Sequence, residues 1–404
     1  DQSSVLYPTP GNENTKNEIG LINQNLYSNL SYSGQLSDNW QFNSGISFTD
    51  NTDKYSMQIK NIDESEKAIQ TKAVFIYHKN NNFKVKSGIE LSYEKYKNKF
   101  QSADTASYTS RQDQSFSAMF SEVELKPTDH IAIQAGIRTE HSYLLNKSNI
   151  TPRISMAYAL NDKSQLSFAT GRFYQNPSRD MLQFAKNAGF EHADHYILNY
   201  QYIGNSRIFR IEPYYKVYGK LLKTTEMYSV SPNDYSNSGS GYARGIDIFW
   251  RDQKTFKYGD YWVSYSYIDS KRDYRDYPKQ AIPPFVTKHN FSLVAKYFVA
   301  KLSTQFGLSA SYNSGHTYYN PNNSNFLSDK TKAYSDLSVN ASYLTNIFGQ
   351  FTIVHASMTN LAGTNHIFTY RYADTPGSDG IFPGYAVKPI TKRFFFLGIF
   401  ITLK

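Results

Sequence analysis

The sequence predicts an all-β chain that folds as an antiparallel transmembrane β-barrel. Apolar and polar residues alternate with period two in many segments rich in Tyr, Phe, Val and Thr. The connections between these segments are alternately short and long. The 404 residues include 35 Tyr, 27 Phe and 3 Trp, but no Cys. The missing cysteines exclude disulfide frameworks and thiolate metal sites, and so many rings argue against disorder.

Alternation defines the individual strands. In WQFNSGISF (40–48), Trp40, Phe42 and Phe48 share one face, while the other face is mostly polar. The same pattern recurs in 164–174, 260–269 and 336–344. Seventeen strands are predicted, beginning near Ile19, Trp40, Ala68, Phe83, Ser115, His130, Ile150, Ser164, His192, Arg207, Tyr242, Asp260, Lys288, Lys301, Lys332, Gln350 and Arg393.

The connections predict how these strands are joined. Short turns rich in Asn, Asp and Gly suit tight hairpins. They fall at Ser37–Asn39, Asn80–Asn82, Pro127–Asp129, Asn161–Lys163, Gly204–Ser206, Val299–Ala300 and Asn346–Gly349, with a longer one at Gln253–Gly259. Long loops are predicted at 50–66, 98–114, 175–190, 221–241, 271–287, 314–331 and 361–392, and one connection on that side, 145–149, is short.

Short turns at one end and long loops at the other, around strands of about ten residues or more, are typical of an outer-membrane β-barrel. Closure removes the exposed edges that so many antiparallel strands would leave. Tyr and Trp suit the two membrane interfaces. No segment approaches the ~20 apolar residues that a membrane helix needs. A Greek-key sandwich is the alternative, although it gives no reason for long loops on one side only.

Several segments resemble the barrel of TonB-dependent outer-membrane receptors of the Bacteroidetes type. The resemblance is specific over 115–404 and looser over 1–114. It is carried by TPRISMAYALNDKSQLSFATGRFYQNPS (151–178), GFEHADHYILNYQY (189–202), GYARGIDIFWRD (241–252), DYWVSYSYIDSKRDY (260–274), FVTKHNFSLVAKYF (285–298), AYSDLSVNASYL (333–344), FTIVHASMTNLAGTNHIFTYRY (351–372) and KRFFFLGIFITLK (392–404). The ending on Leu403 and Lys404, where the family usually ends on an aromatic residue, is a mild departure.

The resemblance implies a 22-stranded barrel with an N-terminal plug domain and a TonB-binding box. Residues 1–404 are assigned entirely to the barrel, because neither the plug nor the box is recognised among them. With a periplasmic C-terminus, the strand at Ile19–Leu36 runs towards the periplasm, so another strand is expected before it. Seventeen is odd, whereas bacterial single-chain barrels have even strand numbers. Either the chain is the C-terminal part of a receptor, lacking about five strands, or it is a complete smaller barrel with one strand uncounted.

The function implied by the resemblance is energised uptake of a scarce nutrient, with a ferric siderophore or another small chelate favoured. The expected location is the outer membrane of a Gram-negative bacterium. The expected partners are outer-membrane lipid or lipopolysaccharide, the TonB–ExbB–ExbD energy-coupling complex and a surface lipoprotein. Two alternatives stay open: a structural or binding barrel that does not transport, and a passive porin.

One loop is a candidate ligand contact. The segment 270–288 has more basic than acidic residues, and Lys271, Arg272, Arg275 and Lys279 are predicted to contact an anionic ligand. The alternative is a solvated loop with no binding role.

Other motifs predict no chemistry. His192 and His195 should point to opposite strand faces, so they do not form a metal pair. The acidic run NIDESE (61–66) is interpreted as a solvated loop, and Pro213 predicts a bulge or a local strand end. The basic residues behind the net charge of +9 are scattered, which argues against nucleic-acid binding. We therefore expect no enzyme activity, catalytic residue, metal or cofactor.

Overall fold

The computed structural model describes residues 2–9, 12–57, 60–102, 107–227 and 229–403. Eighteen strands form one antiparallel sheet. The strands are β1 (Gln2–Thr9), β2 (Asn12–Ser37), β3 (Trp40–Met57), β4 (Lys60–Asn80), β5 (Phe83–Ser102), β6 (Tyr108–Thr128), β7 (Ile131–Ser142), β8 (Lys147–Asn161), β9 (Ser164–Gln175), β10 (Glu191–Gly204), β11 (Arg207–Thr224), β12 (Tyr235–Asp252), β13 (Gly259–Asp273), β14 (His289–Val299), β15 (Thr304–Asn313), β18 (Tyr334–Ile347), β19 (Gln350–Thr359) and β22 (Phe394–Ile401).

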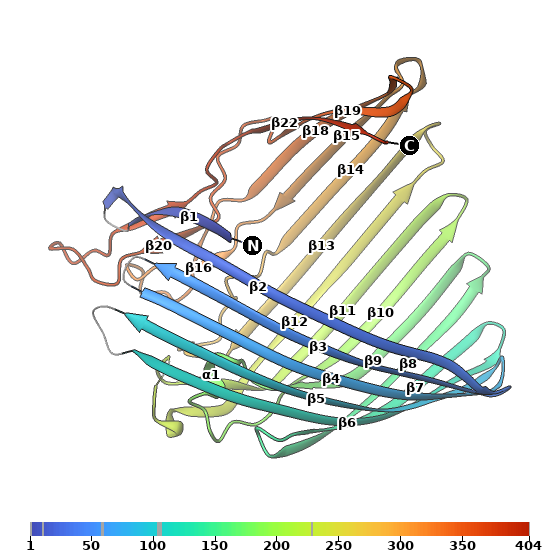
Figure 1. Cartoon of the computed structure of the whole chain (residues 1–404), viewed down its shortest axis with the longest axis horizontal. Helices are drawn as coiled ribbons and strands as arrows, with labels where there is room; N and C mark the ends of the chain where they lie inside the picture. The colour runs from blue at the N-terminus through green and yellow to red at the C-terminus, as the bar shows by residue number, and fades with distance from the viewer. Residues whose placement is uncertain (1, 10–11, 58–59, 103–106, 228, 404) are drawn as a thin grey trace.

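Each strand of the sheet pairs with its neighbour in the chain. The ladders run from β1–β2 through β14–β15 and continue as β15–β18, β18–β19 and β19–β22. The sheet curls into a barrel wall, with β1 and β2 facing β22 across the front of the view (Figure 1). Among the described residues, no ladder joins β1 to β22. No helix in the described ranges is long and apolar enough to cross a membrane.

The predicted fold class is confirmed, and the strand count differs by one. The uncounted strand is β1, which pairs antiparallel with the first part of β2, where a preceding strand was expected. Its sequence QSSVLYPT lacks regular alternation and contains Pro8, which cannot donate a backbone hydrogen bond. Its pairing through the backbone is therefore invisible to a pattern based on side chains.

The loops predicted at 50–66 and 98–114 are wrong over most of their length. β3 and β4 stay paired as far as Met57 and Lys60, and β5 and β6 as far as Phe100 and Tyr108. Residues 58–59 and 103–106 lie outside the described residues. Beyond the membrane both faces of a strand meet water, so hydrophobic alternation stops while backbone pairing continues. The acidic run 61–66 accordingly lies in β4, which corrects its interpretation as a loop.

The bulge predicted at Pro213 is also wrong. β11 runs from Arg207 to Thr224, and Pro213 keeps register opposite Ile246 of β12. On the other side, the β10–β11 ladder passes from Ile197–Tyr214 to Tyr200–Ile211 without a shift. The ladder therefore tolerates the missing donor as a local gap on one side of the strand.

The predicted asymmetry between the two ends of the barrel is confirmed. Tight turns gather at one end, while the long connections gather at the other (Figure 1). Short elements occur within the connections: α1 (Arg179–Leu182), a 3-10 turn η1 (Pro232–Asp234), a second turn η2 (Ala300–Leu302) at the tight-turn end, and the hairpins β16 (Thr317–Tyr318) with β17 (Asp329–Lys330) and β20 (Thr369–Tyr372) with β21 (Gly384–Val387).

The two faces of the sheet differ in chemistry. Outward positions carry exposed apolar side chains, such as Leu30 at 72% and Ile137 at 55% exposure. The inward face is polar and charged. There Arg138 forms ion pairs with Glu90 and Glu140, each at 2.7 Å, and Lys72 also pairs with Glu90. The apolar outward face suits contact with lipid, and the polar inward face suits contact with water.

Candidate functional site

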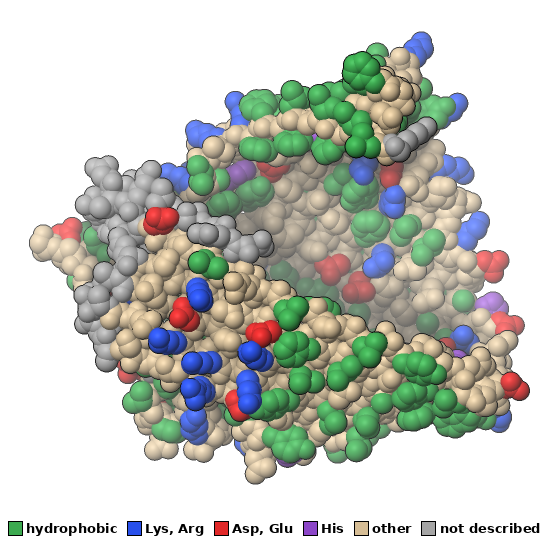
Figure 2. All heavy atoms as spheres, in the orientation of Figure 1, with side chains coloured by type: hydrophobic (Ala, Val, Ile, Leu, Met, Phe, Trp, Pro, Cys, Tyr) green, Lys and Arg blue, Asp and Glu red, His purple; other side chains and the backbone are tan. Residues whose placement is uncertain are grey.

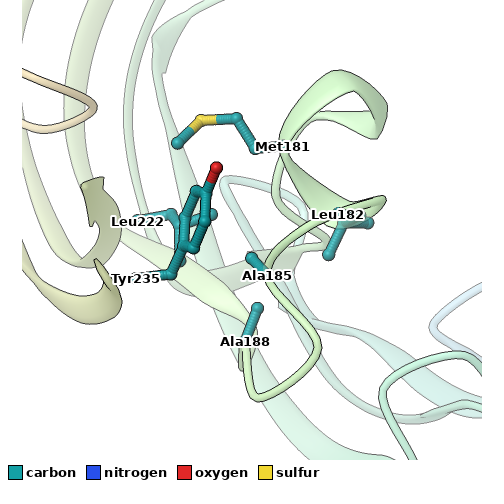
Figure 3. Packing of buried hydrophobic residues seen from close by; sticks show 6 residues of the cluster. All are labelled: Met181, Leu182, Ala185, Ala188, Leu222 and Tyr235. Carbon is teal, nitrogen blue, oxygen red and sulfur yellow. The ribbon is translucent and has the colours of Figure 1, made fainter. Parts of the chain in front are cut away.

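The connection between β9 and β10, residues 176–190, is packed as a folded loop. Its core includes Leu222 of β11 and Tyr235 of β12, and Leu222 is only 1% exposed. Figure 3 shows the side chains of this cluster converging between α1 and the adjoining strands. The cluster comprises Met181, Leu182, Ala185, Ala188, Leu222 and Tyr235. Burial of these groups fixes α1 at the barrel mouth.

Arg179, the first residue of α1, reaches the wall formed by β4 and β5. Its Nη1 lies 3.1 Å from Glu66 Oε2, and its Nη2 donates to Glu94. Its guanidinium also lies 4.2 Å from the ring centre of Tyr96. Because β9 and β10 are several strands away from β4, the loop must cross part of the mouth to make these contacts.

The next residue, Asp180, contacts a different wall. Arg275 Nη2, from the β13–β14 connection, donates to Asp180 Oδ2 at 3.0 Å. The backbone of Arg275 has φ of 54°, in the left-handed region that a side chain rarely adopts. It is held there by hydrogen bonds with Leu222 O and Thr224 N, at 2.7 and 2.8 Å. α1 is thus tethered in two directions by two consecutive residues.

Two cavities open beside this loop. One of about 810 Å³ is lined mainly by residues of β3 to β7, together with Arg179 and the end of β9. Another of about 550 Å³ is lined by residues of β9, β10, β11 and β13. Tyr174, Gln175 and Asn176 contribute to both cavities, so the start of the loop divides the mouth between them.

Two cations that line the smaller cavity, Arg272 and Lys216, have no counterion in the described part of the chain. Among the described residues, no carboxylate lies within 4.0 Å of the charged nitrogens of Arg272 or Lys216. Arg272 is surrounded by rings, with its guanidinium 4.4 Å from Tyr218 and 5.1 Å from Phe285. Arg272 Nε is buried and has no hydrogen-bond partner in the described part of the chain. A buried donor of this kind destabilises the fold unless an acceptor from outside the chain, such as a bound ligand, forms a hydrogen bond with it.

The loop that follows Arg272, between β13 and β14, has its own packed core. Arg272 and Ala281 exchange backbone hydrogen bonds of 2.9 Å, which close the loop at its base. Above them, Tyr277 packs with Ala281 and Leu327. Burial raises the pKa of the Tyr277 hydroxyl, so this ring stays neutral well beyond physiological pH. These contacts therefore hold the base of the loop, and with it the Arg272 guanidinium, in a fixed position.

The four predicted contact residues separate into two pairs. Arg272 and Arg275 line the smaller cavity together. Lys271 and Lys279 are exposed and lie outside the lining of that cavity. The outward direction of the Lys271 side chain follows from strand alternation, because its neighbour Arg272 points inward.

Several site residues were missed from the sequence. Alternation along 207–220 places Lys216 and Tyr218 on one face, which could have identified them as inward neighbours. The contacts of Arg179 with Glu66 and Glu94 had no local signal, since they depend on a loop folding across the mouth.

His192 and His195 point to opposite faces of the sheet, as strand alternation predicts. His195 packs on Phe173 and His192 on Tyr174, with ring centres 4.6 and 5.8 Å apart. Because Phe173 and Tyr174 are consecutive in β9, the two histidines occupy opposite faces. Within the described ranges, no group of three or more His, Asp or Glu side chains could hold a metal ion.

A transmembrane antiparallel barrel with a polar interior and a loop folded over its mouth defines the class of outer-membrane receptors and transporters. The family model described as TonB dependent receptor-like, beta-barrel matches residues 2–361. The chain therefore belongs to the TonB-dependent receptor family, whose members are outer-membrane proteins. The narrower resemblance to receptors of the Bacteroidetes stays a prediction. No curated protein sequence matches this chain.

Solved structures show the same fold at low identity. The outer-membrane transporter YddB from Escherichia coli is 11% identical, with a TM-score of 0.71 over 98% of this chain and 65% of its own. The ferric citrate transporter FecA is 11% identical, with a TM-score of 0.73 over 96% and 62%. The ferric yersiniabactin uptake receptor FyuA from Yersinia pestis is 13% identical, with a TM-score of 0.70 over 95% and 61%. The chain thus spans less than two thirds of these structures.

Proposed function

We propose that this chain is the barrel of a receptor that imports a small anionic chelate, such as a ferric siderophore, across the outer membrane. Residues 1–404 form its barrel domain, and the TonB–ExbB–ExbD complex supplies the energy. The observation that supports this choice of ligand is a pair of cations, Arg272 and Lys216, in a cavity of about 550 Å³; neither has a counterion among the residues that the structure describes. The names of FecA and FyuA, both receptors for ferric chelates, support the same class.

Each residue of the cavity has a defined part in this proposal. Arg272 and Lys216 bind carboxylate or phenolate oxygens of the chelate, and charge-assisted hydrogen bonds satisfy the buried Arg272 Nε. Tyr218 stacks on the guanidinium and holds it towards the cavity. Arg275 positions α1 through Asp180. Lys271 and Lys279, exposed at the rim, attract the anion before it enters.

The test is uptake of iron-55 complexes of citrate and of a catecholate siderophore by the native host. A strain lacking the gene receives the wild-type gene, Arg272→Gln, or Lys163→Gln as a control at a periplasmic turn. We expect uptake to require the gene and the proton-motive force. Arg272→Gln should lower uptake at subsaturating ligand about tenfold or more, because one charge-assisted contact is lost.

Three results would contradict parts of the proposal. Uptake of both chelates that does not depend on the gene would exclude this ligand class. Gene-dependent uptake that survives a protonophore would favour the passive porin. A deletion strain with normal uptake but a disrupted outer-membrane assembly would favour the structural subunit.

A further inference from the structure

A third cavity, which we call the wall cavity, lies on the inner wall of the barrel. It measures about 260 Å³ and is lined by residues of β6 to β10. Phe173 and His195 line both this cavity and the cavity of about 550 Å³, whereas Arg272 and Lys216 are not part of its lining. In Figure 2 the molecule is hollow, and acidic and basic side chains lie close together on its inner surface.

The register of the strands places the wall cavity inside the barrel. Gly136 and the inward residue Arg138 share one face of β7, because they are two positions apart. Glu122 of β6 and Arg153 of β8 are both directly opposite Gly136. These two charged side chains therefore stand on the inner wall, with one glycine between them.

Two glycines leave the room that the wall cavity occupies. A Cβ on Gly136 would lie 2.8 Å from Glu122 Cγ, and a Cβ on Gly171 would lie 2.9 Å from Arg153 Cγ. A larger residue at either position would displace the charged side chain beside it, because these distances are shorter than a carbon–carbon contact. The space above the glycines is thus bounded by a carboxylate and a guanidinium.

Both charges at this cavity are available to a ligand. Among the described residues, neither Glu122 nor Arg153 has an oppositely charged group within 4.0 Å. Lys86 is opposite Glu122 in the β5–β6 ladder, but within the described ranges it forms no ion pair with it. Glu122 accepts a hydrogen bond of 3.3 Å from Gln134. Arg153 is exposed to the space in front of it.

One side of the wall cavity is apolar. The Arg153 guanidinium lies 4.5 Å from the ring centre of Phe173, and the His195 ring lies 4.6 Å from the same ring. Ala169 and Ile197, which are opposite each other in the β9–β10 ladder, continue this surface. The cation–π contact holds the guanidinium over the ring and leaves the N–H groups at its edge free to donate hydrogen bonds.

We propose that the wall cavity binds a zwitterionic α-amino acid with an apolar side chain. Arg153 binds the carboxylate, because a guanidinium matches a carboxylate with two parallel hydrogen bonds. Glu122 binds the ammonium group, and Phe173 contacts the apolar side chain.

The charges and the size of the cavity both favour this class of ligand. A simple anion would be repelled by Glu122 and a simple cation by Arg153, whereas a molecule with both charges is attracted by both residues. Sites for drug-sized ligands begin at about 300 Å³, so the wall cavity suits a smaller molecule. The inference does not rest on the imported chelate, since it concerns other charged residues and another ligand.

The experiment measures binding to the purified full chain in detergent micelles by isothermal titration calorimetry. The probe is L-phenylalanine. It is compared with 3-phenylpropionate, which lacks the ammonium group, and with 2-phenylethylamine, which lacks the carboxylate. The test variants are Glu122→Gln and Arg153→Gln. The matched controls are Asp129→Asn, at a tight turn, and Arg210→Gln, whose exposed side chain is not part of the cavity lining.

We expect L-phenylalanine to bind the wild type and both controls equally. Each analogue should bind the wild type at least tenfold more weakly, because one charge-assisted contact is missing. Arg153→Gln should weaken the binding of L-phenylalanine about tenfold or more without weakening that of 2-phenylethylamine. Glu122→Gln should have the same effect on L-phenylalanine without weakening the binding of 3-phenylpropionate. Misfolding would not produce this crossed pattern, since it would weaken the binding of every probe.

Three results would overturn the proposal. The first is the absence of saturable L-phenylalanine binding to the wild type. The second is equal affinity of the wild type for L-phenylalanine and 3-phenylpropionate, which would identify a site for an aromatic anion. The third is unchanged L-phenylalanine binding in both test variants, which would place the bound amino acid elsewhere. The comparison of the three probes on the wild type decides the class of ligand even where a variant does not fold.

Discussion

Arg179 Nη1 lies 3.1 Å from Glu66 Oε2, although 113 positions separate the two residues in the chain. The neighbour of Arg179, Asp180, accepts a hydrogen bond from Arg275 on another wall. Two consecutive side chains of α1 therefore tie the loop 176–190 to opposite sides of the mouth. The position of the loop, in turn, sets the sizes of the two cavities beside it.

Arg179→Gln should loosen this loop. The half-exposed ion pairs with Glu66 and Glu94 contribute about 1 kcal/mol to the closed position, since solvent screens them. Hydrogen exchange of the amides in 178–190 should accelerate several-fold. Arg244→Gln, which breaks an ion pair with Asp269 elsewhere, is the control and should leave these amides unchanged. Unchanged exchange in Arg179→Gln would show that packing alone holds the loop.

Leu222→Ala should destabilise the same loop by a different route. Leu222 is 1% exposed inside the cluster of Figure 3, and removing it leaves a cavity that costs about 2–4 kcal/mol. Trypsin should then cleave faster after Lys186, an exposed residue of the loop. Leu302→Ala, at a side chain 57% exposed, should leave the cleavage rate unchanged. Equal cleavage in both variants would argue against a packed loop core.

Tyr218→Leu should weaken anion binding without abolishing it. The ring lies 4.4 Å from the Arg272 guanidinium and holds it by a cation–π contact. Such a contact contributes about 1 kcal/mol, so the affinity for the transported chelate should fall about fivefold, less than in Arg272→Gln. The measurement is an equilibrium titration of the purified receptor. Tyr196→Leu, at an exposed position, is the control. A larger loss in Tyr218→Leu than in Arg272→Gln would assign the main contact to the ring.

Alkaline pH should weaken the hairpin of β16 and β17 only above about pH 10. Burial, followed by a hydrogen bond with Tyr372, raises the pKa of Tyr318 from its ordinary value of 10.0 to about 12. Because the folded form keeps the proton longer, the stabilisation is complete below pH 10 and declines as pH rises from 10 towards 12. Absorbance at 295 nm should show that Tyr318→Phe removes one of the tyrosines that ionise near pH 12. Tyr319→Phe controls for the loss of a phenol, and an unchanged curve in Tyr318→Phe would contradict the assignment.

The fold was predictable because its signals are local. Residues such as Trp40, Phe42 and Phe48 fall on one face simply because strand side chains alternate, and the pairing of β3 with β4 keeps them there. The tight turns were found for the same reason. The strand β1 and the polar ends of β3 to β6 were missed, since outside the membrane no difference between lipid and water is imposed on the two faces.

The candidate site was predictable only in part. Charge excess directed attention to the segment 270–288, where Arg272 at the end of β13 and Arg275 in the following loop line one cavity. It could not separate them from Lys271 and Lys279, because composition does not reveal which side chains point into the barrel. Lys216 and Tyr218 required the register of β11 with its neighbours.

The sequence by itself determined an antiparallel barrel, its two chemically different faces and the end that carries the long loops. These properties depend on alternation and turn residues, which act over a few positions. Only the tertiary structure decided that Arg179 contacts Glu66. It also decided that Arg272, which has no counterion among the described residues, lines one cavity with Lys216. Those relationships arise because curvature of the sheet and inward folding of one loop bring together side chains far apart in the chain.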